Sequence, residues 1–435
     1  MRTLIQRLIA VALVLGGVVA YGDTLDSGDS AWILTSTALV LFMTIPGLSL
    51  FYGGLVRSNS VLSVLMQCFT ITCLVTILWV VIGYSLAFGG SGNLIGGVGK
   101  FLFSGVGEDS MSGTIPESIF AAFQLTFAII TPALIVGGFA ERMRFSAVLL
   151  FTALWSLVVY APIAHWVWGG GMLSADGWFG DWFGAGVMDF AGGTVVHITA
   201  GTAALVAAVV LGARRGFPEG VQPPHNMTLT VAGAAMLWVG WFGFNGGSAL
   251  AANGDAAMAL TVTHISAAAG AFTWLVIEWI RYGKPSALGA VTGMVAGLGT
   301  ITPASGFVGP AGALIIGISA GTVCFFATNF MKQKLKIDDS LDVFPVHAVG
   351  GALGTILTGV FASTALGVFS GQHDISIPSQ VGVQVLGVLV TVAYTAIGTF
   401  IILKVTNALV GNRVSDEEET EGLDLVSHNE RGYIL

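Results

Sequence analysis

Two histidines lie inside apolar stretches of this chain, each preceded by an acidic residue. In the stretch Asp189-Phe-Ala-Gly-Gly-Thr-Val-Val-His197 the imidazole follows the carboxylate by eight residues, which is about 12 Å along a helix. The stretch Asp342-Val-Phe-Pro-Val-His347 repeats the order of acid and histidine. Ionisable side chains inside a membrane span cost free energy and usually mark a substrate or proton path. Because histidine exchanges protons near neutral pH, the pair is a candidate for proton transfer or for hydrogen bonding to a passing molecule.

Each of these residues also has a structural interpretation. Asp189 is followed by Gly192, Gly193 and Thr194, a pattern typical of a carboxylate that caps a helix by accepting backbone N–H bonds. A single buried histidine is often only a core residue, but two at matching places would require two independent accidents. We therefore assign the histidine pair to function, and Asp189 and Asp342 to structural support of the site.

Composition indicates the class of protein. Of the 435 residues, 54% are hydrophobic and 9% are charged, compared with about 25% charged residues in a soluble domain. We therefore expect an integral membrane protein in a lipid bilayer, whose 61 glycines allow close helix packing. The three cysteines lie in apolar runs without metal-ligand spacing. The sequence shows no nucleophile–base pair or phosphate loop, so we expect no enzymatic activity, metal, cofactor or nucleic-acid partner.

The first residues resemble a secretory signal. Arg2 and Arg7 precede the apolar run 8–20, which ends in small residues and is followed by a polar stretch. We interpret residues 1–20 as a signal peptide that is cleaved near Tyr21. The alternative is a short uncleaved anchor, although the run is shorter than the roughly 20 apolar residues of a full span.

The rest of the chain predicts one all-α membrane domain, residues 21–409, followed by a cytoplasmic tail, residues 410–435. Eleven apolar segments are long enough to cross a bilayer. They cover residues 31–56, 61–88, 116–139, 145–165, 193–211, 227–247, 257–280, 286–302, 310–331, 346–366 and 378–409.

Basic residues occur almost only in alternate connections. These are Arg57, Arg142, Arg144, Arg214, Arg215, Arg281, Lys284, Lys332, Lys334 and Lys336, and the single exception is Lys100. Because basic connections stay in the cytoplasm, the N-terminus is expected outside and the tail inside.

The two halves of the chain resemble each other. Three pairs of strings match: Phe51-Tyr-Gly-Gly54 with Phe244-Asn-Gly-Gly247, Ile130-Thr-Pro-Ala133 with Ile301-Thr-Pro-Ala304, and Asp189/His197 with Asp342/His347. Each match pairs one span with the span five places later, so the halves have opposite topology. An inverted five-plus-five repeat with a final helix places the binding path between the halves, where the two imidazoles can meet.

Several strings together resemble the bacterial ammonium transporters of the Amt/Rh family. They are Phe51-Tyr-Gly-Gly-Leu-Val-Arg57, Ala140-Glu-Arg-Met-Arg-Phe-Ser146, His165-Trp-Val-Trp-Gly-Gly-Gly171, Gly240-Trp-Phe-Gly-Phe-Asn245 and the two Asp–His motifs. The resemblance implies a homotrimer in the bacterial inner membrane, with one hydrophobic path per subunit that moves ammonium or ammonia inward for nitrogen uptake. Pro345 departs from the family pattern, which has a small residue there.

The resemblance also implies roles for aromatic residues. Trp168 corresponds to the aromatic residue of an external ammonium site, with Phe127 and Ser248 beside it. Phe123, Phe127 and Phe244 correspond to the mouth and gate of the path, and Trp241 to a residue that packs against the histidines. An ammonium ion on an aromatic face gains roughly 0.5–2 kcal/mol. The alternative for any one of these aromatics is the belt of Trp and Tyr at membrane boundaries.

The acidic tail resembles the regulatory C-terminus of the family, including Glu421-Gly-Leu-Asp424 and Ser427-His428. In that family a signalling protein of the PII type docks at the cytoplasmic face and blocks the path. A solvated tail without such a role is the alternative.

Two other functions compete with transport of ammonium. An ammonium sensor that signals through the tail would share every feature of the path, although no appended signalling domain follows Lys404. A coupled amino-acid transporter would need a basic side chain for the substrate carboxylate, and the predicted spans contain no Lys or Arg except Lys404, near the end of the last span. Under the leading hypothesis, His197 and His347 form a neutral hydrogen-bonded pair, since burial disfavours the charged imidazolium. Potassium cannot donate hydrogen bonds or lose a proton, so it would be excluded by its desolvation cost.

Overall fold

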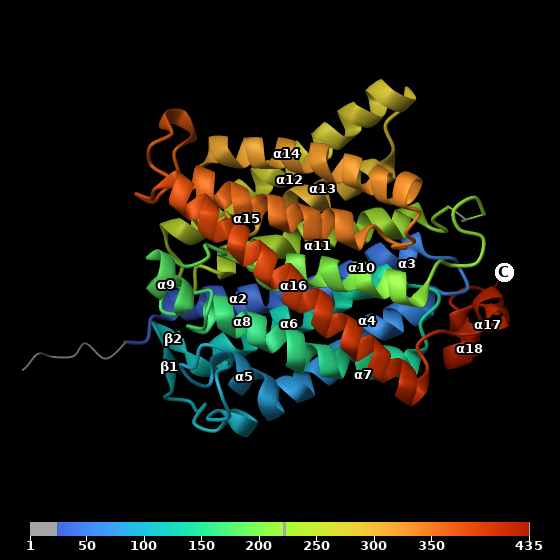
Figure 1. Cartoon of the computed structure of the whole chain (residues 1–435), viewed down its shortest axis with the longest axis horizontal. Coiled ribbons are helices and arrows are strands. Elements are labelled where there is room, and N and C mark those ends of the chain that lie inside the picture. The colour runs from blue at the N-terminus through green and yellow to red at the C-terminus, as the bar shows by residue number, and fades with distance from the viewer. Residues whose placement is uncertain (1–23, 221–222, 435) are drawn as a thin grey trace, which may run out of the picture.

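The computed structural model describes residues 24–220 and 223–434, so the predicted signal peptide, residues 1–20, lies outside the described residues. The long helices run roughly along one direction, which is horizontal in Figure 1. The strands of the described chain form one short antiparallel hairpin, β1 (Met111–Ser112) with β2 (Ile115–Pro116).

The described residues contain eleven helical spans. In chain order these are α2 (Ser27–Phe42), η1 (Met43–Leu48) and α3 (Ser49–Leu55); α4 (Val61–Leu78), η2 (Trp79–Gly83) and α5 (Tyr84–Phe88); α6 (Glu117–Phe139); α7 (Phe145–Trp155), η4 (Ser156–Tyr160) and α8 (Ala161–Trp168); η5 (Gly193–Ile198) and α10 (Thr199–Leu211); α11 (Met227–Gly247); α12 (Gly254–Tyr282); α13 (Ala287–Ile301); α14 (Pro310–Phe330) and η6 (Met331–Leu335); η7 (Phe344–Ala348) and α15 (Val349–Phe361); and α16 (Ile377–Val410). The shorter helices are η3 (Phe101–Phe103), α9 (Trp178–Phe183), η8 (Gly367–Phe369), α17 (Asp416–Glu421) and α18 (Leu423–His428).

The predicted all-α membrane architecture is confirmed. Ten spans are long and apolar enough to cross a membrane, and α13 is a shorter apolar helix of 15 residues at the place of the predicted eighth span. The largest difference in bounds is at the tenth span, which ends at Phe361 instead of residue 366. An odd number of spans places the start of α2 and the end of α16 at opposite ends of the bundle (Figure 1).

Basic connections gather at the end of the bundle that holds the tail helices α17 and α18, on the right in Figure 1. Side-chain contacts join four connections there, because Arg57 pairs with Glu141, and Arg214 pairs with both Glu141 and Asp338. The hairpin and α9 lie at the opposite end. The charge asymmetry of the sequence therefore distinguishes the two ends of one bundle, here called the tail end and the hairpin end.

The fifth span begins at a buried carboxylate. Oδ1 of Asp189 accepts hydrogen bonds from the backbone N–H groups of Gly192 at 2.8 Å and Gly193 at 2.6 Å. Oδ2 accepts from the N–H of Thr194 at 2.8 Å and of Val195 at 3.3 Å, and from the Thr194 hydroxyl. These N–H groups have no partner within the helix, so the carboxylate satisfies donors that would otherwise be buried unpaired.

The tenth span also begins at a carboxylate, but this is Asp339 and not Asp342, the acid that the sequence assigned to structural support of the site. Asp339 caps this span, because its Oδ2 accepts from the N–H of Phe344 at 2.7 Å. Oδ2 of Asp342 binds Nζ of Lys332 at 2.7 Å instead. Asp339 precedes His347 by eight residues, as Asp189 precedes His197, so the two halves match in spacing as well as in order.

Small residues let the fifth and tenth spans cross closely. A Cβ atom added at Gly201 would lie 2.6 Å from Cβ of Ala348, and one added at Gly351 would lie 2.9 Å from Cβ of His197. Both distances are shorter than real Cβ contacts, so this crossing requires glycine at both positions. The crossing sets the separation of the two histidines.

Candidate functional site

His197 and His347 meet where the fifth and tenth spans cross. Their Nδ1 atoms lie 3.2 Å apart, so one ring donates a hydrogen bond to the other. The rings are nearly parallel, with centroids 5.2 Å apart and an angle of 22° between their planes. Both residues are buried, and Nε2 of His197 has no hydrogen-bond partner among the described residues. The contact leaves one nitrogen of His197 available to a molecule beside the pair.

Trp241 holds the pair in place. Its ring stacks on that of His197, with centroids 5.4 Å apart and planes 21° from parallel. Its Nε1 donates to Oγ1 of Thr302 at 2.9 Å, which fixes the indole against the imidazole. Thr302 lies in the Ile301-Thr-Pro-Ala304 string that marked the internal repeat, and the sequence gave no separate indication of this role.

The two histidines line a narrow cavity of about 10 Å³. That volume is close to the least that holds one water-sized molecule. The remaining lining residues are Met43, Leu48, Phe51, Ile130, Leu134, Val196, Leu237, Trp241, Phe244 and Val295. Apart from the histidines and the tethered indole, the wall consists of hydrocarbon, aromatic rings and the Met43 thioether, so an ion inside this cavity would lose its hydration with little compensation.

Three phenylalanines close the cavity toward the hairpin end. The rings of Phe127 and Phe244 lie 4.3 Å apart between centroids, and Phe123 meets Phe127 edge-on at 5.0 Å. All three side chains are fully buried. The residues predicted as mouth and gate therefore pack together as one cluster of rings between the cavity and the hairpin end.

Beyond this cluster lies a depression of about 300 Å³ at the hairpin end. Trp168, Phe127 and Ser248, the residues predicted for an external site, all line it. The Trp168 indole is fixed by donating to the backbone oxygen of Asp189 at 2.9 Å and meets Phe127 nearly at right angles. The Ser248 hydroxyl donates to the Phe244 carbonyl at 2.8 Å, so its oxygen remains free to accept a hydrogen bond. Gln124 also lines the depression, which the sequence did not indicate.

On the other side of the histidines a chamber of about 510 Å³ leads toward the tail end. His347 lines both this chamber and the narrow cavity. Arg214, Lys332, Lys336 and Asp342 supply its charged wall. From the hairpin end to the tail end, the bundle thus contains the depression, the phenylalanine cluster, the histidine cavity and the chamber. Asp342 lines the chamber and not the histidine cavity.

A sequence model of the Ammonium Transporter Family matches residues 31–433. The chain belongs to the ammonium transporter family. It is 46% identical over 417 residues to the ammonium transporter of Bacillus subtilis, which covers 94% of this chain and 99% of that protein. Its fold is similar to the crystal structure of Saccharomyces cerevisiae Mep2, with a TM-score of 0.81 and 37% identity over 91% of this chain and 89% of that one. It is also similar to a structure named Sensor Amt Protein, with a TM-score of 0.83 and 29% identity over 92% of this chain and 98% of that one.

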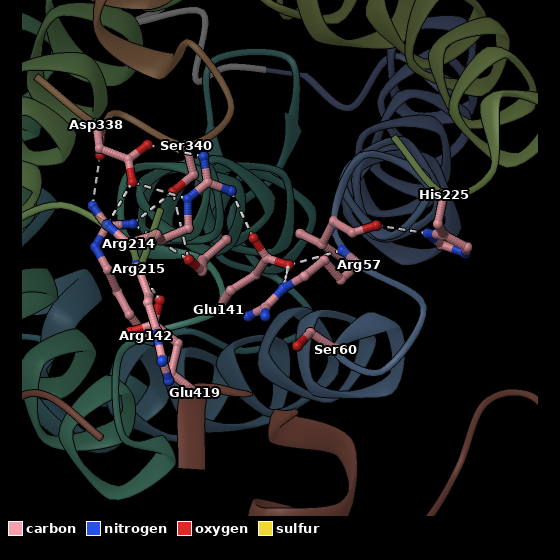
Figure 2. Close-up of polar contacts among 12 residues, drawn as sticks. Arg57, Ser60, Glu141, Arg142, Arg214, Arg215, His225, Asp338, Ser340 and Glu419 are labelled. Carbon is pink, nitrogen blue, oxygen red and sulfur yellow. Dashed lines mark hydrogen bonds and ion pairs between the residues drawn. The ribbon is translucent and has the colours of Figure 1, made fainter. Parts of the chain in front are cut away.

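In this family member, an ion network joins the connections at the tail end (Figure 2). Glu141 binds Nε of Arg57 at 2.8 Å and Nη1 of Arg214 at 2.6 Å, and Nη2 of Arg214 reaches Asp338 at 2.9 Å. Arg142 is fully buried, and its Nη1 donates to the Ser340 hydroxyl at 2.6 Å. Burial alone would raise the pKa of Glu141, but the charges of Arg214 and Arg57 outweigh it and hold that pKa below its ordinary value.

The tail of this transporter is folded against the bundle. The Asp424 carboxylate accepts from the backbone N–H groups of Leu62 at 3.0 Å and Ser63 at 2.7 Å, so the tail caps the start of α4. Nη1 of Arg413 donates to the carbonyl of Leu211 at 2.8 Å. A solvated tail, the alternative considered from the sequence, does not describe these contacts.

The capping roles of Asp339 and Asp424 were not predicted from the sequence. Asp339 carries a signal that could have identified it, because it repeats the eight-residue spacing from acid to histidine. Asp424 was noted as part of a tail motif, but nothing in its neighbourhood indicates a contact with a helix 361 positions away.

Proposed function

We propose that this protein carries ammonium or ammonia inward across the cell membrane, through one path in each subunit of a homotrimer. The observation that carries the proposal is the hydrogen-bonded contact of His197 and His347 in a narrow apolar cavity, with an aromatic depression outside it. The hairpin end faces outward and the tail end faces the cytoplasm in this proposal. The gathering of basic connections at the tail end supports that orientation.

Ammonium would bind first in the outer depression. The faces of Trp168 and Phe127 attract the cation, and the Ser248 oxygen accepts one of its hydrogen bonds. The apolar wall beyond Phe127 and Phe244 disfavours a charge, so ammonia would pass the cavity as the neutral molecule. Its hydrogen bonds would be supplied by the free histidine nitrogens, while the proton would either stay outside or be relayed by the pair.

Recordings of current in a reconstituted bilayer test the proposal. The wild-type protein should give a current on an ammonium pulse if the pair relays the proton, or ammonia flux into vesicles without current if the proton stays outside, and no current with potassium in either case. Replacing both histidines by alanine should remove the ammonium current, whereas His197→Asp should relax the exclusion of potassium. His264→Ala is the matched control, because His264 is exposed on α12 and contacts Trp238 and Phe242 instead of the path. A double alanine variant with wild-type current and potassium exclusion would show that the pair only packs the core.

A sensor function remains the second candidate, since the solved Sensor Amt Protein has a similar fold. Both functions need an ammonium site, but only the transporter needs a path that opens at both ends. Wild-type protein that binds ammonium in the depression and gives neither ammonium current nor ammonia flux into vesicles would favour the sensor.

The tail end is also the proposed docking surface for a PII-type signalling protein. The folded tail and the basic connections together form this surface, and the family supports the partner. Deletion of the residues after Arg413 should weaken that docking, as measured by co-purification with a PII-type protein. If a PII-type protein still bound the truncated protein fully and blocked its transport fully, the tail would have no role in docking.

A further inference from the structure

A cavity of about 230 Å³ lies beneath the tail, away from the conduction path. It is bounded by the end of the first span, the connection after the fifth span, and tail helix α17. Its lining residues are Leu55, Arg57, Glu141, Arg214, Arg215, Gly220, Glu419 and Thr420. The volume exceeds that of one phosphate ion, and three guanidinium groups face two carboxylates in its wall.

Two of the arginines have unused hydrogen-bond donors. Arg57 binds Glu141 through Nε, and its Nη2 has no partner among the described residues. Arg215 uses Nη1 to bind the Thr420 hydroxyl at 2.9 Å, and within the described chain its guanidinium forms no ion pair. An arginine presents five N–H donors in a planar fork that suits a carboxylate or a phosphate. Unused arginine donors of this kind beside a cavity are typical of an anion site, whereas the Thr420 hydroxyl already donates to the Asp416 carbonyl at 2.7 Å.

The two carboxylates of the cavity are already committed to other groups. Glu141 binds Arg57 and Arg214, as Figure 2 shows. Glu419 accepts from Nη2 of Arg413 at 2.8 Å and from the backbone N–H of Arg215 at 2.7 Å. Within the described residues, neither carboxylate bonds Nη2 of Arg57 or the guanidinium of Arg215. An additional anion would complete the balance of charge.

We propose that this cavity binds a tetrahedral oxyanion of the phosphate class, held by the guanidinium groups of Arg57 and Arg215 and placed beside the hydroxyl of Thr420. The shared chemistry has two sources: a free phosphate ion, or a phosphoryl group carried by Thr420 itself. In both cases the oxyanion joins the first span, the connection before α11 and the tail. Charge-assisted bonds of this kind are about twice as strong as neutral ones, so the anion fastens the tail to the bundle.

The exposed position of Thr420 suits either source. Its side chain lies on the surface of α17, where it meets Arg215 and can be reached from solution. Glu417, Glu418, Glu419 and Glu421 surround it in sequence. Such flanking acids are expected to repel a free anion in the undocked tail, but in the docked tail Glu419 is neutralised by Arg413. The site is therefore complete only when the tail is in place.

The test measures protection of the tail by inorganic phosphate. Purified full-length protein, treated with a phosphatase, is digested with a glutamate-specific protease in increasing phosphate, with chloride adjusted to keep the ionic strength constant. Phosphate should slow cleavage within 417–421 several-fold in a saturable manner. Arg215→Gln should abolish this effect, whether or not it loosens the tail by itself, because each variant is compared with and without phosphate. Arg431→Gln is the matched control. It also removes one positive charge, but Arg431 lies in the tail and lines a different cavity.

A second measurement distinguishes the sources. Mass spectrometry of the protein isolated from its own cells shows whether Thr420 carries a covalent phosphoryl group. If it does, the site holds a phosphothreonine, and Thr420→Val should make the isolated tail as easily cleaved as the phosphatase-treated protein. If it does not, saturable protection by inorganic phosphate assigns the site to a free anion.

Two results would overturn the inference. One is unmodified Thr420 together with no protection of the wild-type tail by phosphate. The other is equal protection of the wild-type protein and Arg215→Gln, which would show a general salt effect. The protease readout needs no movement of ammonium, so it can fail while the proposed transport stands, and it can succeed if the protein is a sensor.

Discussion

Replacing Asp189 by asparagine should destabilise the start of the fifth span. The carboxylate is buried and accepts through both oxygens. An asparagine side chain keeps one oxygen for Gly192 and Gly193, but its amide nitrogen would face the N–H groups of Thr194 and Val195, donor against donor. Each buried donor left without a partner costs about 1–3 kcal/mol, so two of them cost about 2–6 kcal/mol.

The cost can be converted into a shift of the unfolding temperature. An unfolding entropy of about 2 cal/mol/K per residue gives about 0.9 kcal/mol/K for a chain of this length, or roughly 1 °C per kcal/mol. Asp189→Asn should therefore lower Tm by about 2–6 °C. Trp168 donates to the backbone oxygen of Asp189, so the outer depression should be displaced as well and the ammonium current reduced.

The assay is thermal unfolding of the purified protein in detergent, followed by tryptophan fluorescence. Asp342→Asn is the matched control, because Asp342 binds Lys332 near the chamber and asparagine tolerates its positive φ of 60°. Its Tm should fall by less than that of Asp189→Asn. Equal effects of the two variants, or an unchanged Tm for Asp189→Asn, would refute the assignment of Asp189 as the cap.

Three other outcomes are expected. Trp168→Leu removes one cation–π face, worth about 0.5–2 kcal/mol, so discrimination between ammonium and methylammonium should weaken; unchanged methylammonium competition would contradict the external site. Burial and the charge of Asp342 raise the pKa of Asp339 to about 7, so the folded state binds this proton more tightly than the unfolded state. The stability that protonated Asp339 contributes is present below its unfolded pKa and is lost as pH rises through 7. Between pH 5 and pH 8, Tm should therefore fall more steeply in wild type than in Asp339→Asn, and equal slopes would contradict a raised pKa of Asp339. Asp424→Ala removes the cap of α4 and should speed tail proteolysis, whereas unaltered cleavage would argue for a tail held by its other contacts.

Much of the fold could be predicted because a bilayer restricts it strongly. A span needs about 20 apolar residues with all backbone groups paired internally, so the sequence directly indicates the number and order of helices. The histidine pair could also be predicted, since two ionisable groups in apolar runs at matching places of an inverted repeat should meet. The distance between them could not, because it depends on glycines such as Gly201 and Gly351, which resemble the other glycines of the chain.

The supporting residues were harder to predict for a physical reason. Asp339 and Asp342 are both acids before the same span, and only the backbone path decides which carboxylate reaches the first turn. The tail is harder still, because its contacts are between polar groups at the surface and leave no periodic pattern. Motif resemblance indicated the tail residues, but the structure was needed to assign Asp424 to α4.

The contact between Asp424 and α4 also sets an order of events during synthesis. The carboxylate lies 361 positions after Ser63, and at about 5–20 residues per second a ribosome needs roughly 20–70 s to make the intervening chain. During that interval the first turn of α4 has only water for these N–H groups. A chain that stops early in translation never acquires this carboxylate and keeps an open helix end at its surface. Closure of that end therefore requires that the tail has been synthesised.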